Sequence, residues 1–246
     1  MAHSTSLSSP APERPAVDSP RGSQLALDRV RRFYKWQAGL YDYTRPWLLR
    51  GRSELIDELP ARLDVAVDVG SGTGFALPGL LRIARQVIAV EPSPDMRHRA
   101  QRRVAKLAAS ARVTWDTRPY GTPSSTRANV DAVVFSYSLS MIPEFESAVE
   151  RAEVDLAPGG QIAVVDFVSA RWRPFGDFLT RCHVDLGEER LEFLQQRFPQ
   201  HTLSLRRGPL WSYFLFWGRR PTDSEGRRLG DSPTARHRKP ESTRAG

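Results

Sequence analysis

The sequence predicts an α/β fold built on a mostly parallel, seven-stranded β-sheet with one antiparallel strand. From Asp64 onward, short valine-rich apolar runs alternate with longer amphipathic segments, a pattern typical of strands buried on both faces and of the helices that connect them. Two further apolar runs near the end are separated only by Gly208-Pro209, which indicates a hairpin. With 246 residues, 40% of them hydrophobic, the chain is long enough to bury a substantial core. Helices are therefore expected on both faces of the sheet.

The individual elements follow from the same alternation. Runs that are apolar on successive residues predict strands at 65–69, 87–90, 113–115, 132–135 and 161–167. Between them, apolar residues recur at helical spacing and predict helices at 76–84, 95–109 and 145–156. The hairpin is expected to use 201–207 and 210–218, with the aromatic residues from Trp211 to Trp217 as core.

Composition excludes several classes of protein. One cysteine, Cys182, permits neither an intramolecular disulfide nor a cysteine-cluster zinc site, which fits a reducing compartment, and no metal site is expected. No run reaches the roughly 18 apolar residues that a membrane span needs. The N-terminus lacks the basic start and apolar stretch of a secretory signal, so we expect a cytoplasmic protein.

The net charge of +8 is unevenly distributed along the chain. Residues 1–28 carry −1 and are expected to form a disordered leader. Residues 29–62 hold eight cations against four acids and are expected to form a helical lid. Residues 63–218, the expected ligand-binding domain, carry only +1, and the Arg-, Pro- and Ser-rich residues 219–246 carry +4 and predict a disordered basic tail.

The first crossover of the predicted sheet carries a glycine-rich loop. The strand at 65–69 runs into Gly70-Ser71-Gly72-Thr73-Gly74, where bare backbone and a helix N-terminus can approach a ligand. The glycines follow G-x-G-x-G rather than the dinucleotide pattern, which favours a smaller ligand without a pyrophosphate. Glu91 follows the second strand, 21 residues after Gly70, where a carboxylate can accept both hydroxyls of a ribose.

Four segments in order resemble the class I S-adenosylmethionine-dependent methyltransferases: 67–75, 89–96, 130–138 and 156–167. The resemblance implies a Rossmann-like fold and S-adenosylmethionine as cofactor. It places Asp68 under the methionine end of the cofactor, the glycine loop beside its amino acid part and Glu91 on its ribose. Asp116, after the third strand, matches the acid that often bonds the adenine amino group, although a capping role is the alternative. The remaining cofactor-binding residues implied are Pro92, Met96, Ser136 and Tyr137.

Two stretches, 32–52 and 136–145, look more narrowly like the bacterial betaine-lipid N-methyltransferases, which methylate the amino group of diacylglycerylhomoserine. The resemblance implies a lipid amine as substrate. It departs after His183, where Asp-Leu-Gly-Glu-Glu stands in place of a more basic stretch. The identity of the headgroup is therefore open, and phosphatidylethanolamine N-methyltransferases are the near alternative.

The expected reaction needs a neutral amine and a place for a methylated cation. Asp166 could accept the amine proton or orient the ammonium group, and His183 is a second candidate acceptor with a capping role as its alternative. Aromatic faces stabilise methylated ammonium groups. The candidates for that role are Tyr34, Tyr41, Tyr43 and Tyr137. Tyr41 is also grouped with the catalytic candidates.

Residues 29–52 interleave cations, Arg45 and Arg52 among them, with large aromatic side chains. Such a segment suits the surface of an anionic membrane, which would make the protein peripheral on the inner face, and it equally suits a lid packed on the core. Three other functions stay open. They are methylation of a soluble small molecule, RNA binding or modification, and a nucleotide-sensing module without catalysis. RNA is not expected because the central body is nearly neutral, and the oligomeric state is left open.

Overall fold

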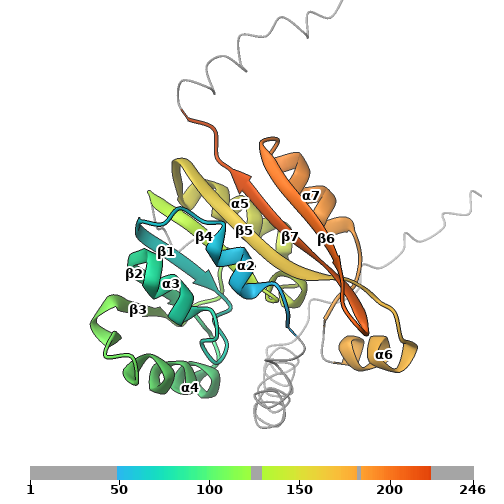
Figure 1. Cartoon of the computed structure of the whole chain (residues 1–246), viewed down its shortest axis with the longest axis horizontal. Helices are drawn as coiled ribbons and strands as arrows, with labels where there is room; N and C mark the ends of the chain where they lie inside the picture. Colours follow the sequence, from blue (N-terminus) through green and yellow to red (C-terminus); the bar gives the residue numbers. More distant parts are fainter. Residues whose placement is uncertain (1–48, 123–128, 182–183, 223–246) are drawn as a thin grey trace, which may run out of the picture.

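A seven-stranded sheet in the order β3-β2-β1-β4-β5-β7-β6 forms the centre of the computed structural model (Figure 1), which describes residues 49–122, 129–181 and 184–222. The strands are β1 (Leu63–Val69), β2 (Ala84–Val90), β3 (Val113–Asp116), β4 (Val130–Ser136), β5 (Leu156–Ala170), β6 (His201–Arg207) and β7 (Trp211–Arg219). Strands β1 to β5 pair in parallel, and β7 runs antiparallel to both β5 and β6. The predicted fold class and the terminal hairpin are confirmed.

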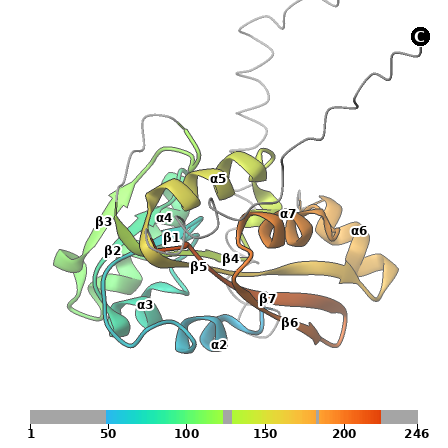
Figure 2. The same ribbon diagram turned by 90° about the horizontal axis from the view of Figure 1, so that it is seen from above.

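Helices cover both faces of this sheet (Figure 2). They are α2 (Arg52–Asp57), α3 (Leu77–Ile83), α4 (Pro94–Ala105), α5 (Phe145–Asp155), α6 (Arg173–Arg181) and α7 (Glu189–Arg197), with short 3-10 turns η1 (Ser110–Arg112) and η2 (Leu139–Met141). Side chains of α2, α3, α4 and α6 join one hydrophobic cluster, and those of α5 and α7 join a second. The central strands are buried between these two cores, which explains their unbroken apolar sequence. None of these helices is long and apolar enough to cross a membrane.

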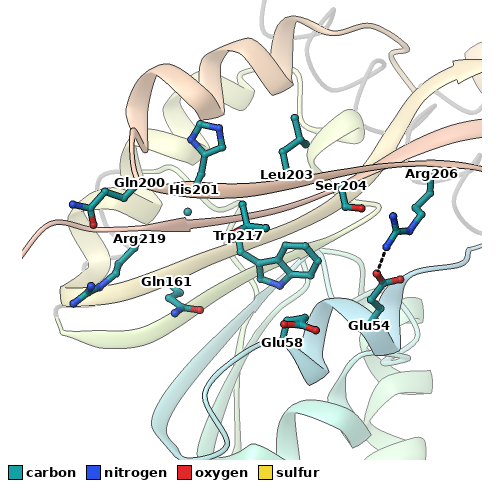
Figure 3. A pocket seen from close by; sticks show the side chains of 12 residues that line it. Glu54, Glu58, Gln161, Gln200, His201, Leu203, Ser204, Arg206, Trp217 and Arg219 are labelled. Carbon is teal, nitrogen blue, oxygen red and sulfur yellow. Dashed lines mark hydrogen bonds and ion pairs between the residues drawn. The ribbon is translucent and has the colours of Figure 1, made fainter.

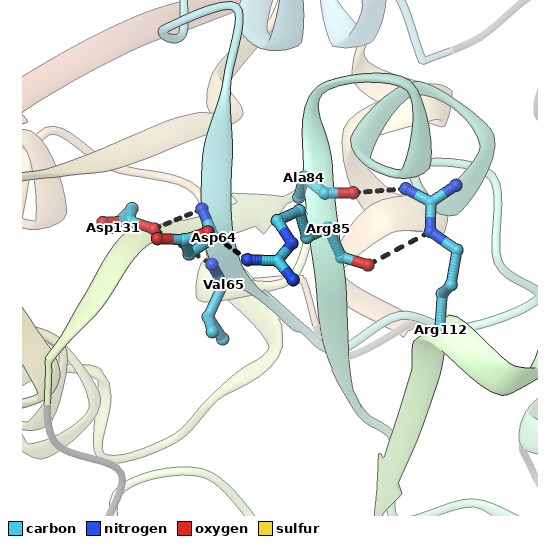
Figure 4. A network of polar contacts seen from close by, with 6 residues as sticks. All are labelled: Asp64, Val65, Ala84, Arg85, Arg112 and Asp131. Atoms are coloured by element: carbon cyan, nitrogen blue, oxygen red, sulfur yellow. Dashed lines mark hydrogen bonds and ion pairs between the residues drawn. The ribbon is translucent and has the colours of Figure 1, made fainter.

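Polar contacts fix the amino ends of the strands (Figure 4). Asp131 Oδ2, at the start of β4, accepts the backbone N–H groups of Asp64 (2.6 Å) and Val65 (2.9 Å). Arg85 pairs with Asp64 at 3.2 Å, and Arg112 donates to the carbonyl of Arg85. These bonds lie at the amino ends of the strands, whereas the glycine loop lies at the carboxyl ends. They therefore fix the register of β1, β2 and β4 without using residues of the glycine loop.

Several predicted boundaries are wrong. The strand predicted at 161–167 begins at Leu156, because the backbone turns from helical to extended there and Leu156 pairs with Val130 before a register shift. The helix predicted to end at 156 therefore ends at Asp155, and the helix predicted to reach 109 ends at Ala105. Helices α6 and α7 were not expected. Of the predicted lid at 29–62, the structure describes the part from residue 49, including α2, whereas the leader and residues 223–246 of the tail lie outside the described residues.

Candidate functional site

The glycine loop joins β1 to α3 at the carboxyl edge of the parallel strands. Gly70, Gly72 and Gly74 all have positive φ values, of 68°, 55° and 80°, which glycine adopts without steric cost. A Cβ on Gly70 would lie 2.6 Å from the Cβ of Ser138, and one on Gly74 would lie 2.9 Å from the Cβ of Ala100. Two of the glycines are therefore required by the packing of the chain itself.

Asp68 is the penultimate residue of β1 and precedes this loop. Its side chain is 1% exposed, and its Oδ2 atom has no hydrogen-bond partner in the described structure. Burial raises the pKa of this carboxyl from 3.8 to about 7, although a hydrogen bond with Ser71 and the charge of Arg52 act in the opposite direction. A buried carboxylate oxygen without a donor is costly, so its presence indicates a ligand that brings a donor or a positive charge.

Arg52 begins α2, and its charge acts on the Asp68 carboxyl against the effect of burial. Its Nε donates to Ser136 Oγ at 2.9 Å, and its guanidinium lies 5.5 Å from the ring centres of both Phe75 and Tyr137. The rings fix the cation in place and contribute about 0.5–2 kcal/mol each. Arg52, predicted from the sequence as a lid residue, is thus brought together with two predicted cofactor-binding residues, Ser136 and Tyr137.

Tyr137 begins the loop after β4 and is held in a strained conformation, with φ of 56°. Its hydroxyl donates to the carbonyl of Arg50 at 2.7 Å, and its backbone N–H donates to the carbonyl of Val165 at 2.8 Å. Burial raises the pKa of this phenol, so it stays protonated. The next residue, Ser138, donates from its hydroxyl to the carbonyl of Val69 at 2.6 Å and ties the loops after β1 and β4 together.

Glu91 lies at the carboxyl end of β2, next to the glycine loop. Its two carboxylate oxygens accept the backbone N–H groups of Gly72 (2.7 Å) and Ser93 (2.8 Å). The Ser93 hydroxyl in turn accepts from the N–H of Met96, which caps α4 and joins Glu91 to the start of that helix. Of this group Met96 is buried, while Pro92 is exposed. Glu91 is therefore oriented by the loop that it was predicted to accompany.

Thr73 lies in the same loop, and both its side chain and that of Ser71 are buried. The Oγ1 atom of Thr73 has no partner in the described structure, and the Thr73 carbonyl accepts from Arg103 Nε at 3.0 Å. Arg103 also lies 4.0 Å from the ring centre of Phe75. Phe75 and Ser138 were not predicted as parts of the site, although both adjoin motifs identified in the sequence. Arg103 could not be singled out from the sequence, because α4 contains several arginines.

Asp116 ends β3, where its backbone carbonyl accepts the N–H of Glu91. Its carboxylate forms two bonds of 3.1 Å to the guanidinium of Arg118 and accepts the backbone N–H of Arg118 at 3.0 Å. The turn-capping alternative is thus present in the structure. A contact with adenine stays a prediction, and the position at the carboxyl edge beside Glu91 is compatible with it.

Asp166 is fully buried in β5, and its carboxylate accepts three hydrogen bonds from this chain. The donors are the Ser140 hydroxyl (2.7 Å), the Ser140 backbone N–H (2.8 Å) and the backbone N–H of Phe167 (2.8 Å). Burial raises the pKa of the Asp166 carboxyl, and these bonds partly offset the effect. Its position holds η2 against β5, and a role toward a substrate amine stays a prediction.

The remaining candidates are Tyr34, Tyr41, Tyr43, Arg45 and His183, which lie outside the described residues together with Cys182. Their roles stay predictions.

A separate cavity of about 710 Å³ opens between α2 and the β6–β7 hairpin (Figure 3). Trp217 forms part of its wall and donates to the carbonyl of Leu55 at 3.0 Å, and Glu54 pairs with Arg206 at 2.7 Å across it. Gln161, at the amino-proximal part of β5, also lines it. None of the predicted cofactor-binding residues lines this cavity, so the candidate site is the glycine-loop edge.

Comparisons with known proteins agree with this geometry. Residues 66–160 match the family model described as "Methyltransferase domain". This part of the chain therefore resembles a methyltransferase domain. An uncharacterised methyltransferase of Mycobacterium tuberculosis is 32% identical over 120 residues, a match that spans 48% of this chain and only 59% of that relative.

Solved structures share the fold of this domain at low sequence identity. The YcgJ protein of Bacillus subtilis superposes with a TM-score of 0.57 at 12% identity, covering 70% of this chain and 98% of YcgJ. Phosphoethanolamine N-methyltransferase 2 of Haemonchus contortus, solved with phosphomonomethylethanolamine and S-adenosylhomocysteine, superposes with a TM-score of 0.61 at 13% identity, covering 73% of this chain and 57% of that enzyme.

The residues present fit S-adenosylmethionine, the cofactor that the sequence predicts. The unpartnered Asp68 Oδ2 suits the cofactor's ammonium group, and the glycine loop leaves backbone in place of side chains. Glu91 is fixed at the carboxyl end of β2 by its bond to Gly72, where the ribose of such a ligand is expected.

Proposed function

We propose that the chain is an S-adenosylmethionine-dependent methyltransferase that methylates the amino group of a membrane lipid headgroup of the homoserine betaine-lipid type. The cofactor part of the proposal rests on the buried Asp68 carboxyl, whose Oδ2 atom has no hydrogen-bond partner in the described structure, together with the Arg52 cation that acts on it and is held between two aromatic rings. The lipid half is supported by the resemblance of residues 32–52 and 136–145 to enzymes of that kind.

Asp68 and Arg52 together complement a zwitterionic amino acid. An α-amino acid presents an ammonium group and a carboxylate, and each finds an opposite charge in this pair. Charge-assisted hydrogen bonds of this type contribute about 1.5–3 kcal/mol each. The methionine part of the cofactor is such a group, so the pair explains why the chain keeps a carboxylate in a buried position that raises its pKa.

When bound, S-adenosylmethionine supplies a methyl group that a neutral amine can attack in line with the breaking carbon–sulfur bond. The chain contributes by holding the two reactants in line and by excluding water. Tyr137, fixed by its bond to the Arg50 carbonyl, places a buried aromatic ring beside Arg52 at the carboxyl end of β4. Such a ring stabilises a methylated ammonium product by about 0.5–2 kcal/mol.

The amine must lose a proton before it attacks, which costs about 1.4 kcal/mol for each unit by which its pKa exceeds the pH. Asp166 and His183 are the proposed acceptors, and Tyr41 is the remaining catalytic candidate. Asp166 also orients η2, because Ser140 on that turn donates to both of its oxygens. The protein is proposed to act in the cytoplasm, held peripherally on an anionic membrane through the basic, aromatic segment 29–52.

Two related substrates compete with this proposal. A phosphatidylethanolamine headgroup carries the same kind of amine, and the Haemonchus contortus structure shows that this fold is used by an enzyme named for phosphoethanolamine. A soluble small-molecule amine would need the same chemistry but no membrane contact.

Mass spectrometry of lipids from cells that express the chain tests the proposal and names the headgroup. The proposal expects homoserine lipid carrying one, two and three added methyl groups, provided that the host makes the unmethylated lipid. The same series on an ethanolamine lipid would assign the alternative headgroup. An unchanged lipid profile, with the protein folded and present, contradicts a lipid substrate.

A further inference from the structure

Helix α6 and the residue just before it present two aromatic side chains to solvent. Trp172, just before the helix, is 55% exposed, and Phe178 within it is 45% exposed. Among the large hydrophobic side chains that stand exposed in the described residues, these two are the aromatic ones. Exposed aromatic residues that share one element indicate a surface with a partner, whereas single exposed aliphatic residues are ordinary.

The helix already buries its inner face, so these aromatic groups are not spare core residues. Phe175 and Leu179 lie four residues apart on one face and are buried, with the Phe175 ring 5.4 Å from the ring of Trp211. Phe178 adjoins this face, with its ring centre 6.3 Å from that of Phe175, and extends the apolar surface outward. Trp172 is held at the start of the helix because its carbonyl accepts the N–H groups of Phe175 and Gly176. The exposed pair is therefore carried on a fixed scaffold.

Cations surround the exposed aromatic groups. Residues 171–181 contain Arg171, Arg173 and Arg181 against one acid, Asp177, and all four side chains are exposed. The Arg171 backbone N–H donates to the carbonyl of Leu210, which joins the start of this segment to the β6–β7 turn. Aromatic rings at headgroup level with arginines reaching phosphates form the pattern of a helix lying in the interface of an anionic bilayer.

The position of α6 relates this surface to the candidate active site. The helix follows the carboxyl end of β5 and lies beyond the tip of the β6–β7 hairpin (Figure 1). The glycine loop follows the carboxyl end of β1, so both features belong to the same edge of the parallel strands. A lipid amine that reaches the cofactor must approach from this edge, because ligands of such sheets bind there.

We infer that Trp172 and α6 form a docking surface for an anionic lipid bilayer, with Trp172 and Phe178 entering the interface and the three arginines contacting lipid phosphates. The inference rests on the proposed function in one respect, since it assigns the membrane contact through which the lipid substrate is delivered. It adds a surface that is independent of segment 29–52.

Co-sedimentation of the full-length protein with phosphatidylglycerol-containing vesicles tests the inference, with pure phosphatidylcholine vesicles as reference. The double variant Trp172→Ala/Phe178→Ala is expected to bind the anionic vesicles at least tenfold more weakly than the unmodified chain. The matched control Leu107→Ala/Val154→Ala removes exposed apolar side chains elsewhere and is expected to bind normally. A second variant, Arg173→Gln/Arg181→Gln, is expected to weaken binding at low salt more than Arg102→Gln, which removes a surface arginine from α4.

Equal binding of the α6 variants and the controls would overturn the inference, as would absence of anionic vesicle binding by the unmodified chain. A concentration-dependent dimer that is lost in the Trp172→Ala/Phe178→Ala variant, without vesicle binding, would overturn it by showing a protein partner instead. Phosphatidylglycerol carries no amine, so the assay does not depend on methyl transfer. Vesicle binding without any lipid methylation would refute the proposed substrate while leaving the docking surface intact.

Discussion

Asp68 offers the sharpest test of the cofactor site, because the fold disfavours its charge and the ligand requires it. Its pKa is raised from 3.8 to about 7 by burial, so the carboxyl is about half protonated at neutral pH. If the ionised form binds the ammonium group of the cofactor, affinity falls about tenfold for each pH unit below that value. S-adenosylhomocysteine, which keeps the same amino acid part, is therefore expected to bind about 100-fold more weakly at pH 5 than at pH 8.

The substitution Asp68→Asn keeps the shape of the side chain and removes its charge. The loss of one charge-assisted bond, about 1.5–3 kcal/mol, lowers the affinity for S-adenosylhomocysteine at pH 8 by about 10- to 150-fold and flattens its pH dependence. The stability effect has the opposite sign. A carboxyl whose pKa is higher in the folded state contributes stability that is full below pH 4 and is lost as the pH rises through 7, about 4 kcal/mol in all. The variant is therefore expected to melt at a higher temperature than the unmodified chain at pH 8.

Titration calorimetry from pH 5 to pH 8, combined with thermal melting, measures both effects. The matched control is Asp177→Asn, the same chemical change at an exposed position of α6, which should alter neither quantity. Weaker binding together with higher stability cannot result from simple misfolding. An affinity of the unmodified chain that stays constant from pH 5 to pH 8, or an Asp68→Asn variant that binds normally, would refute the role of Asp68.

Three further changes have defined outcomes. Gly72→Val puts a β-branched side chain at a φ of 55° beside the Glu91 carboxylate and should abolish S-adenosylhomocysteine binding in calorimetry. Unchanged affinity in a folded variant would contradict the assignment of the glycine loop to the cofactor site. Arg52→Gln should weaken S-adenosylhomocysteine at least tenfold but leave adenosine binding unchanged, and an equal loss for both ligands would remove Arg52 from the amino acid end. Asp166→Asn places an amide N–H₂ against the Ser140 donors and should lower the free energy of unfolding by about 1–3 kcal/mol in urea titrations, without changing cofactor affinity. An unchanged free energy of unfolding would show that these bonds contribute little to stability.

The parts of the fold that are visible in the sequence are those set by local pattern. Buried parallel strands need apolar residues in succession, so β1, β2 and β4 are recognisable in the sequence. The three glycines indicate a loop whose backbone has positive φ values, which glycine adopts most readily. The residues from Asp68 to Gly74 and Glu91 were therefore identifiable, and the structure brings them to one edge.

Contacts that depend on pairing across the sheet were not visible. The length of β5 follows from its pairing with Val130 and with β7, which no local pattern reveals. Asp166 and Asp116 looked equally available for ligands in the sequence, yet their partners Ser140 and Arg118 are known only once the loops are placed. Arg52 was noted as a cation among aromatic residues, and only the structure shows it held over the Tyr137 ring with its charge acting on Asp68.

Release of S-adenosylhomocysteine by the purified protein, measured with S-adenosylmethionine and vesicles of defined headgroup, tests the central claim most directly. Turnover is expected with vesicles that carry the homoserine lipid amine, and it is expected to be lost in the Asp68→Asn variant. Turnover limited to soluble amines, or none with any amine-bearing lipid by a protein that binds the cofactor, would contradict it.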